Sequence, residues 1–234
     1  MIEIIPTNTC PPDLSELARR SKVFSGFSPW VQLDIADGAF VSQRSWPYEE
    51  GQWAECESMA ASSQALPYSN VLHYEVHMMA EEPSRLGELL SRMGASRIIA
   101  HVEAFADTEE IHNALHLWKK AGAQEVGLAI LLTTPLPVLE PLVSLIDVVQ
   151  VMSIATLGAQ GAPFDERAIA RIHDISIQHP GAVIEVDGGV SEKNIADLTR
   201  AGARRFGVGS AISKSPDPKA AYDTLKLLAE NAIQ

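Results

Sequence analysis

The sequence lacks the features that mark several large classes of protein. Only two cysteines are present, Cys10 and Cys56, with neither the number nor the spacing of a disulfide framework or a zinc site. The longest apolar runs, such as 126–132, fall far short of the ~20 residues that a membrane span requires. The first residues carry no basic segment of the signal-peptide type. We therefore expect a cytoplasmic protein with two reduced thiols and no membrane partner.

Basic side chains are scarce as well. The chain has 18 Lys and Arg residues against 30 Asp and Glu, and its formal net charge is −12. This balance argues against a nucleic acid as partner, because nucleic-acid binding depends on neutralising phosphates. None of the lysines falls at the end of a predicted strand, which argues against a Schiff-base aldolase. Walker, dinucleotide-binding and nucleophile-elbow motifs are missing too.

Short apolar runs rich in Val and Ile recur along the chain and alternate with amphipathic stretches. Such runs are typical of strands that are buried on both faces of a parallel sheet. The runs span residues 2–5, 31–36, 72–78, 97–102, 125–131, 147–152, 183–186 and 204–208. Eight strand–helix pairs predict an α/β fold, a single (β/α)8 TIM barrel over residues 1–234. A doubly wound open sheet is the alternative, but it more often carries a Gly-rich turn after its first strand.

Helix signals lie between these runs. Residues 83–93, 108–121 and 191–201 are each followed by a glycine, which is common at the carboxyl end of a helix. The segment at about 40–70, between the second and third strands, is unusually long and aromatic. In a barrel it would form either a lid or subunit contact above the mouth, or a surface excursion with its own small cluster.

Acidic residues stand at the ends of predicted strands, where the active site of a barrel lies. Alternation places Gln32, Asp34 and Ala36 on one face of the second strand. The seventh strand ends at Asp187, so the two carboxylates should face each other across the mouth and suit a two-base proton transfer. His77, on the third strand, completes an Asp–His–Asp set for one divalent metal ion, which would stabilise an enediolate. Singly, each residue also fits a turn or core role, but their joint placement favours function.

Glycines follow the last two predicted strands. Gly188 and Gly189 come after the seventh strand, and Gly209 and Ser210 come after the eighth. Barrels often bind phosphate at these two loops, through backbone N–H groups and a helix N-terminus. The pattern predicts a small-molecule phosphate ligand without a cluster of basic residues. Two ordinary glycine turns are the alternative interpretation.

With these residues in place, the chain resembles the ribulose-phosphate 3-epimerase family over essentially its full length. The resemblance is carried by residues 4–7, 33–41, 76–79, 101–104, 151–153, 184–190, 201–203 and 209–212. It implies a metal-dependent barrel, commonly a homo-oligomer, that interconverts D-ribulose 5-phosphate and D-xylulose 5-phosphate. It also implies acid–base roles for Asp34 and Asp187, and metal ligation by these two residues and His77. Substrate contacts are implied for Thr7, Met79 and Met152.

The departures from the family pattern cluster at the same place. Gln32 stands where the family has its first metal-ligating histidine, and a neutral glutamine oxygen is a weaker ligand than imidazole. Ala36, Ala39 and the lid at 155–161 also differ from the family residues. Three hypotheses follow: a phosphosugar 3-epimerase with a modified site, a catalytically silent sugar-phosphate-binding barrel, or a lyase or isomerase for a different sugar phosphate. The metal could be Zn, Fe, Mn or Mg.

Overall fold

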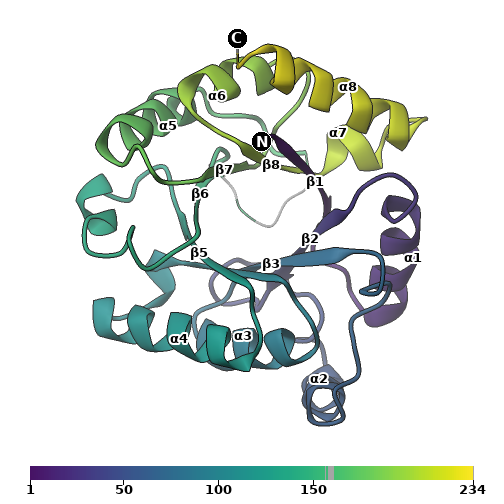
Figure 1. The fold of residues 1–234 in the computed structure, drawn as a ribbon. Coiled ribbons are helices and arrows are strands. Elements are labelled where there is room, and N and C mark those ends of the chain that lie inside the picture. Colours follow the sequence, from purple (N-terminus) through teal and green to yellow (C-terminus); the bar gives the residue numbers. More distant parts are fainter. Residues whose placement is uncertain (156, 158–160, 234) are drawn as a thin grey trace.

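The strands of the protein close into one parallel barrel (Figure 1). The computed structural model describes residues 1–155, 157 and 161–233. The strands are β1 (Glu3–Asn8), β2 (Trp30–Ala36), β3 (His73–Met79), β4 (Arg97–His101), β5 (Glu125–Ile130), β6 (Val148–Met152), β7 (Ile184–Asp187) and β8 (Arg205–Val208). Each strand pairs with the next, and β8 pairs with β1. The predicted (β/α)8 TIM barrel is confirmed, and the open sheet is excluded.

Helices form a layer outside the ring of strands (Figure 1). They are α1 (Leu14–Phe24), α2 (Gln52–Ala61), α3 (Pro83–Arg92), α4 (Thr108–Ala121), α5 (Arg167–Gln178), α6 (Ile195–Ala201), α7 (Ser210–Ser213) and α8 (Pro218–Asn231). Asp13, Asp107 and Asp217 cap α1, α4 and α8, because each side chain accepts a hydrogen bond from a first-turn N–H. Within the described residues, no helix is both long and apolar enough to cross a membrane.

Two helix predictions need correction. Eight strand–helix pairs were expected, but the connection between β5 and β6 holds only the short 3-10 turn η2 (Leu136–Leu139). Three prolines, at 135, 137 and 141, explain this, since proline lacks the N–H that a helix interior needs. The helix expected at 191–201 begins at Ile195, because the side chain of Asn194 holds residues 189–191 in a turn.

The long segment at 40–70 divides between two environments. Trp46 and Cys56 are fully buried, and with α2 they belong to the large core between strands and helices. Phe40 instead packs at the barrel mouth, against a small cluster that includes Met79. The segment therefore contributes one helix, α2, to the outer layer, and Phe40 to the packing at the barrel mouth.

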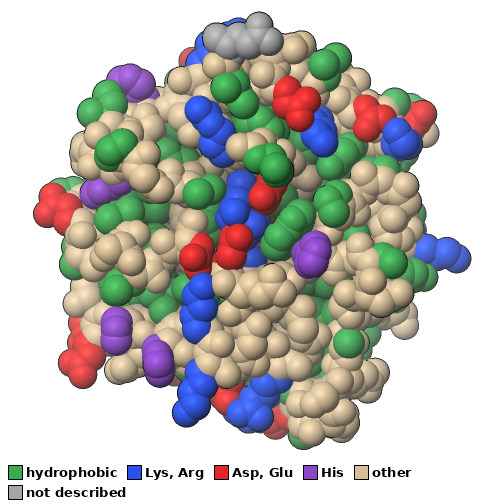
Figure 2. Space-filling model, viewed as in Figure 1, with side chains coloured by type: hydrophobic (Ala, Val, Ile, Leu, Met, Phe, Trp, Pro, Cys, Tyr) green, Lys and Arg blue, Asp and Glu red, His purple; other side chains and the backbone are tan. Residues whose placement is uncertain are grey.

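The barrel interior is charged at the amino ends of the strands. Arg97 lies fully buried between Glu75, Glu125 and Glu3, and Arg205 pairs with the same Glu125 and Glu3. Acidic and basic side chains meet at the centre of the face that Figure 2 shows. One step further in, Gln150 donates to the buried Glu185 at 2.7 Å. Burial and the nearby Glu75 raise the pKa of Glu185 well above its usual range.

Candidate active site

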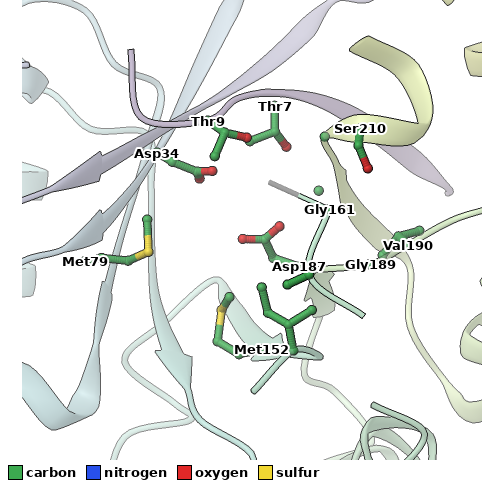
Figure 3. Close-up of a pocket in the computed structure, with 15 residues that line it drawn as sticks. Thr7, Thr9, Asp34, Met79, Met152, Gly161, Asp187, Gly189, Val190 and Ser210 are labelled. Carbon is green, nitrogen blue, oxygen red and sulfur yellow. The ribbon is translucent and has the colours of Figure 1, made fainter. Parts of the chain in front are cut away.

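The barrel brings Asp34, His77 and Asp187 together at the carboxyl ends of β2, β3 and β7. On β2, alternation turns Leu33 and Ile35 outward into the core, so Asp34 points into the barrel. Asp34 pairs in register with His77 on β3. Asp187 is the last residue of β7, and its carboxylate points toward that of Asp34 across the cavity (Figure 3).

The three side chains are close enough to share one ion. His77 Nδ1 lies 3.3 Å from Asp34 Oδ1 and 3.3 Å from Asp187 Oδ2. One ligand atom from each residue lies within 4.8 Å of the others, and His77 is fully buried. Two carboxylates and an imidazole are a common donor set for a divalent cation, so these residues fit a metal site.

Gln32 occupies the space between the two carboxylates. Its amide Nε2 donates to Asp34 Oδ1 at 2.6 Å and to Asp187 Oδ2 at 3.2 Å. The amide oxygen is buried without a hydrogen-bond partner and lies 2.5 Å from the point where a Cβ on Gly207 would stand. The missing side chain on β8 is therefore what lets Gln32 reach Asp187 from β2. In this orientation Gln32 presents a donor to the carboxylates, and it would have to rotate its amide to present oxygen to a cation.

Burial and mutual repulsion shape the ionisation of the site. Burial first, and then the negative charge of Asp187, raise the pKa of Asp34. Burial works to lower the pKa of His77, but hydrogen bonds to Asp187 and Asp34 outweigh it and raise the pKa to about 10. In the absence of a cation, these hydrogen bonds therefore favour the protonated form of His77.

The predicted substrate and phosphate residues line one cavity above this cluster (Figure 3). The cavity wall includes Thr7, Met79, Met152, Gly188, Gly189, Gly209 and Ser210 together with Asp34 and Asp187. Gly188 and Gly189 both have positive φ, +109° and +64°, which side chains rarely adopt. Residues 156 and 158–160 of the predicted lid lie outside the described residues, whereas Gly161 reaches the cavity wall.

Several site residues were not identified from the sequence. Thr9 and Ile154 line the cavity, and no local pattern distinguished them, whereas the Gly-x-Gly spacing with Gly209 was a signal for the third residue, Gly207. His101 and Glu103 lie behind His77, with His101 Nε2 only 3.0 Å from His77 Nε2. The alternation of polar and apolar residues at the end of β4 could have identified His101 and Glu103 as inward-facing, but it did not show that His101 meets His77. Burial lowers the pKa of His101 to about 4.

Comparison with known proteins agrees with this geometry. The model of the ribulose-phosphate 3 epimerase family matches residues 12–213. A ribulose-phosphate 3-epimerase from Aquifex aeolicus is 32% identical over 207 residues, covering 87% of this chain and 86% of its own. The enzyme of the same name from Schizosaccharomyces pombe is 30% identical over 200 residues, covering 85% and 81%.

Solved structures share the fold at lower sequence identity. A 3-keto-L-gulonate-6-phosphate decarboxylase from Vibrio cholerae matches with a TM-score of 0.71 at 11% identity, covering 99% of both chains. A 3-hexulose-6-phosphate synthase from Salmonella typhimurium matches with a TM-score of 0.67 at 18% identity, covering 99% of this chain and 100% of its own. At such identities the likeness supports the barrel alone. The sequence matches go further, and they establish that this chain belongs to the ribulose-phosphate 3 epimerase family.

Proposed function

We propose that the protein is a ribulose-phosphate 3-epimerase, which interconverts D-ribulose 5-phosphate and D-xylulose 5-phosphate. Family membership supports the reaction class. The observation that carries the proposal is the pair of carboxylates, Asp34 and Asp187, that point toward each other across one cavity (Figure 3). Groups placed on two sides of a bound carbon can take a proton from one face and return a proton to the other.

Asp34 and Asp187 exchange roles with the direction of the reaction. One carboxylate accepts the proton from C3, and the electron pair that remains forms an enediolate with the adjacent C2 carbonyl. The other carboxyl group, in its protonated form, delivers its proton to the opposite face of C3. The stereocentre is inverted, and both carboxyl groups must regain their starting protonation from solvent before the next turnover in the same direction.

A divalent cation fits the donor set of Asp34, His77 and Asp187. We propose that Gln32 supplies a fourth donor through its amide oxygen, which has no hydrogen-bond partner among the described residues. When bound, the cation would stabilise the negative charge that develops on the substrate oxygens as the proton leaves carbon. Zn, Fe, Mn and Mg all remain compatible with these donors.

The glycine loops after β7 and β8 are proposed to hold the phosphate group. Gly188 and Gly189 line the cavity from one loop, and Gly209 and Ser210 line it from the other, so their backbone N–H groups would be the donors. Backbone donors explain how a chain with a net charge of −12 could bind an anionic substrate. Thr7, Met79 and Met152 would contact the sugar between the phosphate loops and the aspartates.

The proposal is tested by incubating the purified protein with D-ribulose 5-phosphate in D₂O and following the products by NMR. We expect deuterium at C3 and formation of D-xylulose 5-phosphate. Asp34→Asn and Asp187→Asn should each abolish both signals while the circular dichroism spectrum stays native. Asp197→Asn is the matched control, because Asp197 is an exposed residue of α6 that does not line the cavity.

Other outcomes would point elsewhere. Full activity in either active-site variant would refute the two-aspartate assignment. Carbon–carbon cleavage or carbonyl migration would identify a lyase or isomerase for another sugar phosphate. Binding of the sugar phosphate without exchange or conversion would identify a catalytically silent barrel.

A further inference from the structure

A continuous line of polar contacts runs behind the aspartate pair, away from the cavity. His77 Nε2 lies 3.0 Å from His101 Nε2, and His101 Nδ1 lies 3.2 Å from Glu103 Oε2. The other oxygen of Glu103 accepts a hydrogen bond from the Leu131 N–H at 3.0 Å and one from the Thr134 hydroxyl. Both imidazoles are fully buried. The line therefore joins β3 and β4 to the start of the β5–β6 connection.

The order of donors and acceptors along this line follows from the two ends. Glu103, as a carboxylate, can only accept, so a proton on His101 Nδ1 is donated to it. At the other end, Nδ1 is the ring nitrogen of His77 that faces Asp34 and Asp187. If Nδ1 is to give its lone pair to a cation, the proton of the neutral ring must sit on Nε2. Among the described residues, that proton has one partner within reach, His101 Nε2, which must then accept.

We propose that His101 and Glu103 are positioning residues, which hold His77 in the tautomer whose Nδ1 lone pair points between Asp34 and Asp187. The inference rests on the proposed function, because it assumes that the Asp–His–Asp set holds a cation. Neither residue lines the substrate cavity, so their effect on the site would pass through the contact with His77. Partners of this kind fix the ring orientation of a metal-ligating histidine, and losing one typically costs about 10–100-fold in metal affinity.

Packing supports a fixed orientation rather than a loose contact. The His77 and His101 rings lie 5.1 Å apart between centroids, and Phe40 covers His101 from the mouth with its ring centroid at 4.8 Å. Glu103 is in turn held by the N–H and hydroxyl donors of two residues beyond β5. Each ring therefore has defined partners at both nitrogens, and neither ring could turn over without losing these contacts.

The test measures metal binding, not turnover. Metal-free wild-type protein and variants are titrated with Co²⁺, and then with Zn²⁺ by competition. His101→Leu keeps an apolar side chain of similar bulk but removes the acceptor, and we expect about 10–100-fold weaker binding. His101→Gln retains an acceptor oxygen and should bind within a few-fold of wild type. His116→Leu is the control, because His116 lies exposed on α4.

Nitrogen-15 NMR of ring-labelled, Zn²⁺-loaded wild-type protein adds a direct readout. We expect a metal-bound Nδ1 and a protonated Nε2 for His77, and a protonated Nδ1 for His101. Should His101→Leu fail to fold, Glu103→Gln provides a variant at the less buried end of the line. It removes the carboxylate charge and should weaken metal binding toward the lower end of the same range.

The outcomes separate this inference from the proposed function. Wild-type affinity in a folded His101→Leu or Glu103→Gln protein would overturn the positioning role, as would equal losses in the Leu and Gln variants of His101. A protonated Nδ1 on His77 in the loaded protein would also overturn it. Failure of the wild type to bind any metal would overturn the inference together with the cation site. Lack of epimerisation with normal metal binding would instead count against the substrate assignment alone.

Discussion

Adding one methyl group at Gly207 should disable the site while leaving the barrel folded. Gly207 faces the barrel interior from β8, beside Gln32 and Asp187. A Cβ there would stand 2.5 Å from Gln32 Oε1 and 2.9 Å from Asp187 Oδ1. Ordinary contact begins at 3.4 Å, so the amide must retreat by about 0.9 Å and the carboxylate by about 0.5 Å. No unusual backbone conformation is involved, so the effect of Gly207→Ala comes from crowding alone.

These displacements are large compared with what catalysis tolerates. A misplacement of about 1 Å can cost about 100-fold in rate. Overpacking of a filled interior typically costs about 1–3 kcal/mol of stability. For a chain of this length each kcal/mol lowers Tm by about 2–4 °C. We therefore expect Gly207→Ala to lose about 100-fold in kcat, or more, while remaining folded with a lower Tm.

The assay pairs the epimerase reaction with calorimetry and uses Gly127→Ala as the matched control. Gly127 also faces the interior, but its Cβ would meet Val148 and Ile99 rather than Gln32 or either aspartate. That variant should lose stability and keep kcat within a few-fold of wild type. If both variants lose activity in proportion to their Tm, or if Gly207→Ala keeps wild-type activity, the reasoning about Gln32 and Asp187 is wrong.

Three further predictions concern other parts of the barrel. Glu185→Gln should gain stability relative to wild type as the pH rises above about 4.5. This follows because folded Glu185 retains a proton that the unfolded chain loses there; urea unfolding at pH 5 and pH 8 checks the sign. Arg97→Leu should lower the free energy of unfolding by about 3–5 kcal/mol in the same assay, since it leaves Glu75 buried without its partner. Gly189→Ala should raise KM for the sugar phosphate at least several-fold in steady-state kinetics. Its Cβ would stand 2.9 Å from the Phe164 backbone, and its φ is +64°.

The sequence alone predicted much of the barrel. Residues on a strand alternate between two faces, so a polar residue among Val and Ile identifies a side chain that points inward at a strand end. That rule was sufficient to select Asp34 on β2 and Asp187 at the end of β7. Glycines at helix ends and after the last strands have local conformational causes, and these are also visible in sequence. The prolines before β6 are also visible in the sequence. Hydrophobic periodicity alone, however, did not show that the connection there forms the 3-10 turn η2 instead of an α-helix.

Closure of the barrel decided which inward-facing side chains meet, because contacts between strands that are distant in the sequence leave no local sequence pattern. The alternation along β2 predicts that Gln32 points inward. Only the lack of a side chain on Gly207 of β8 explains why the Gln32 amide reaches Asp187. The charges of Arg97 and Glu125 open predicted strands, and only the barrel shows that they neutralise each other inside it. The two nitrogens of His101 likewise find their partners through neighbouring strands and a loop. The sequence thus determined which side chains face inward, and the tertiary structure decided which of them meet, since barrel register sets those distances.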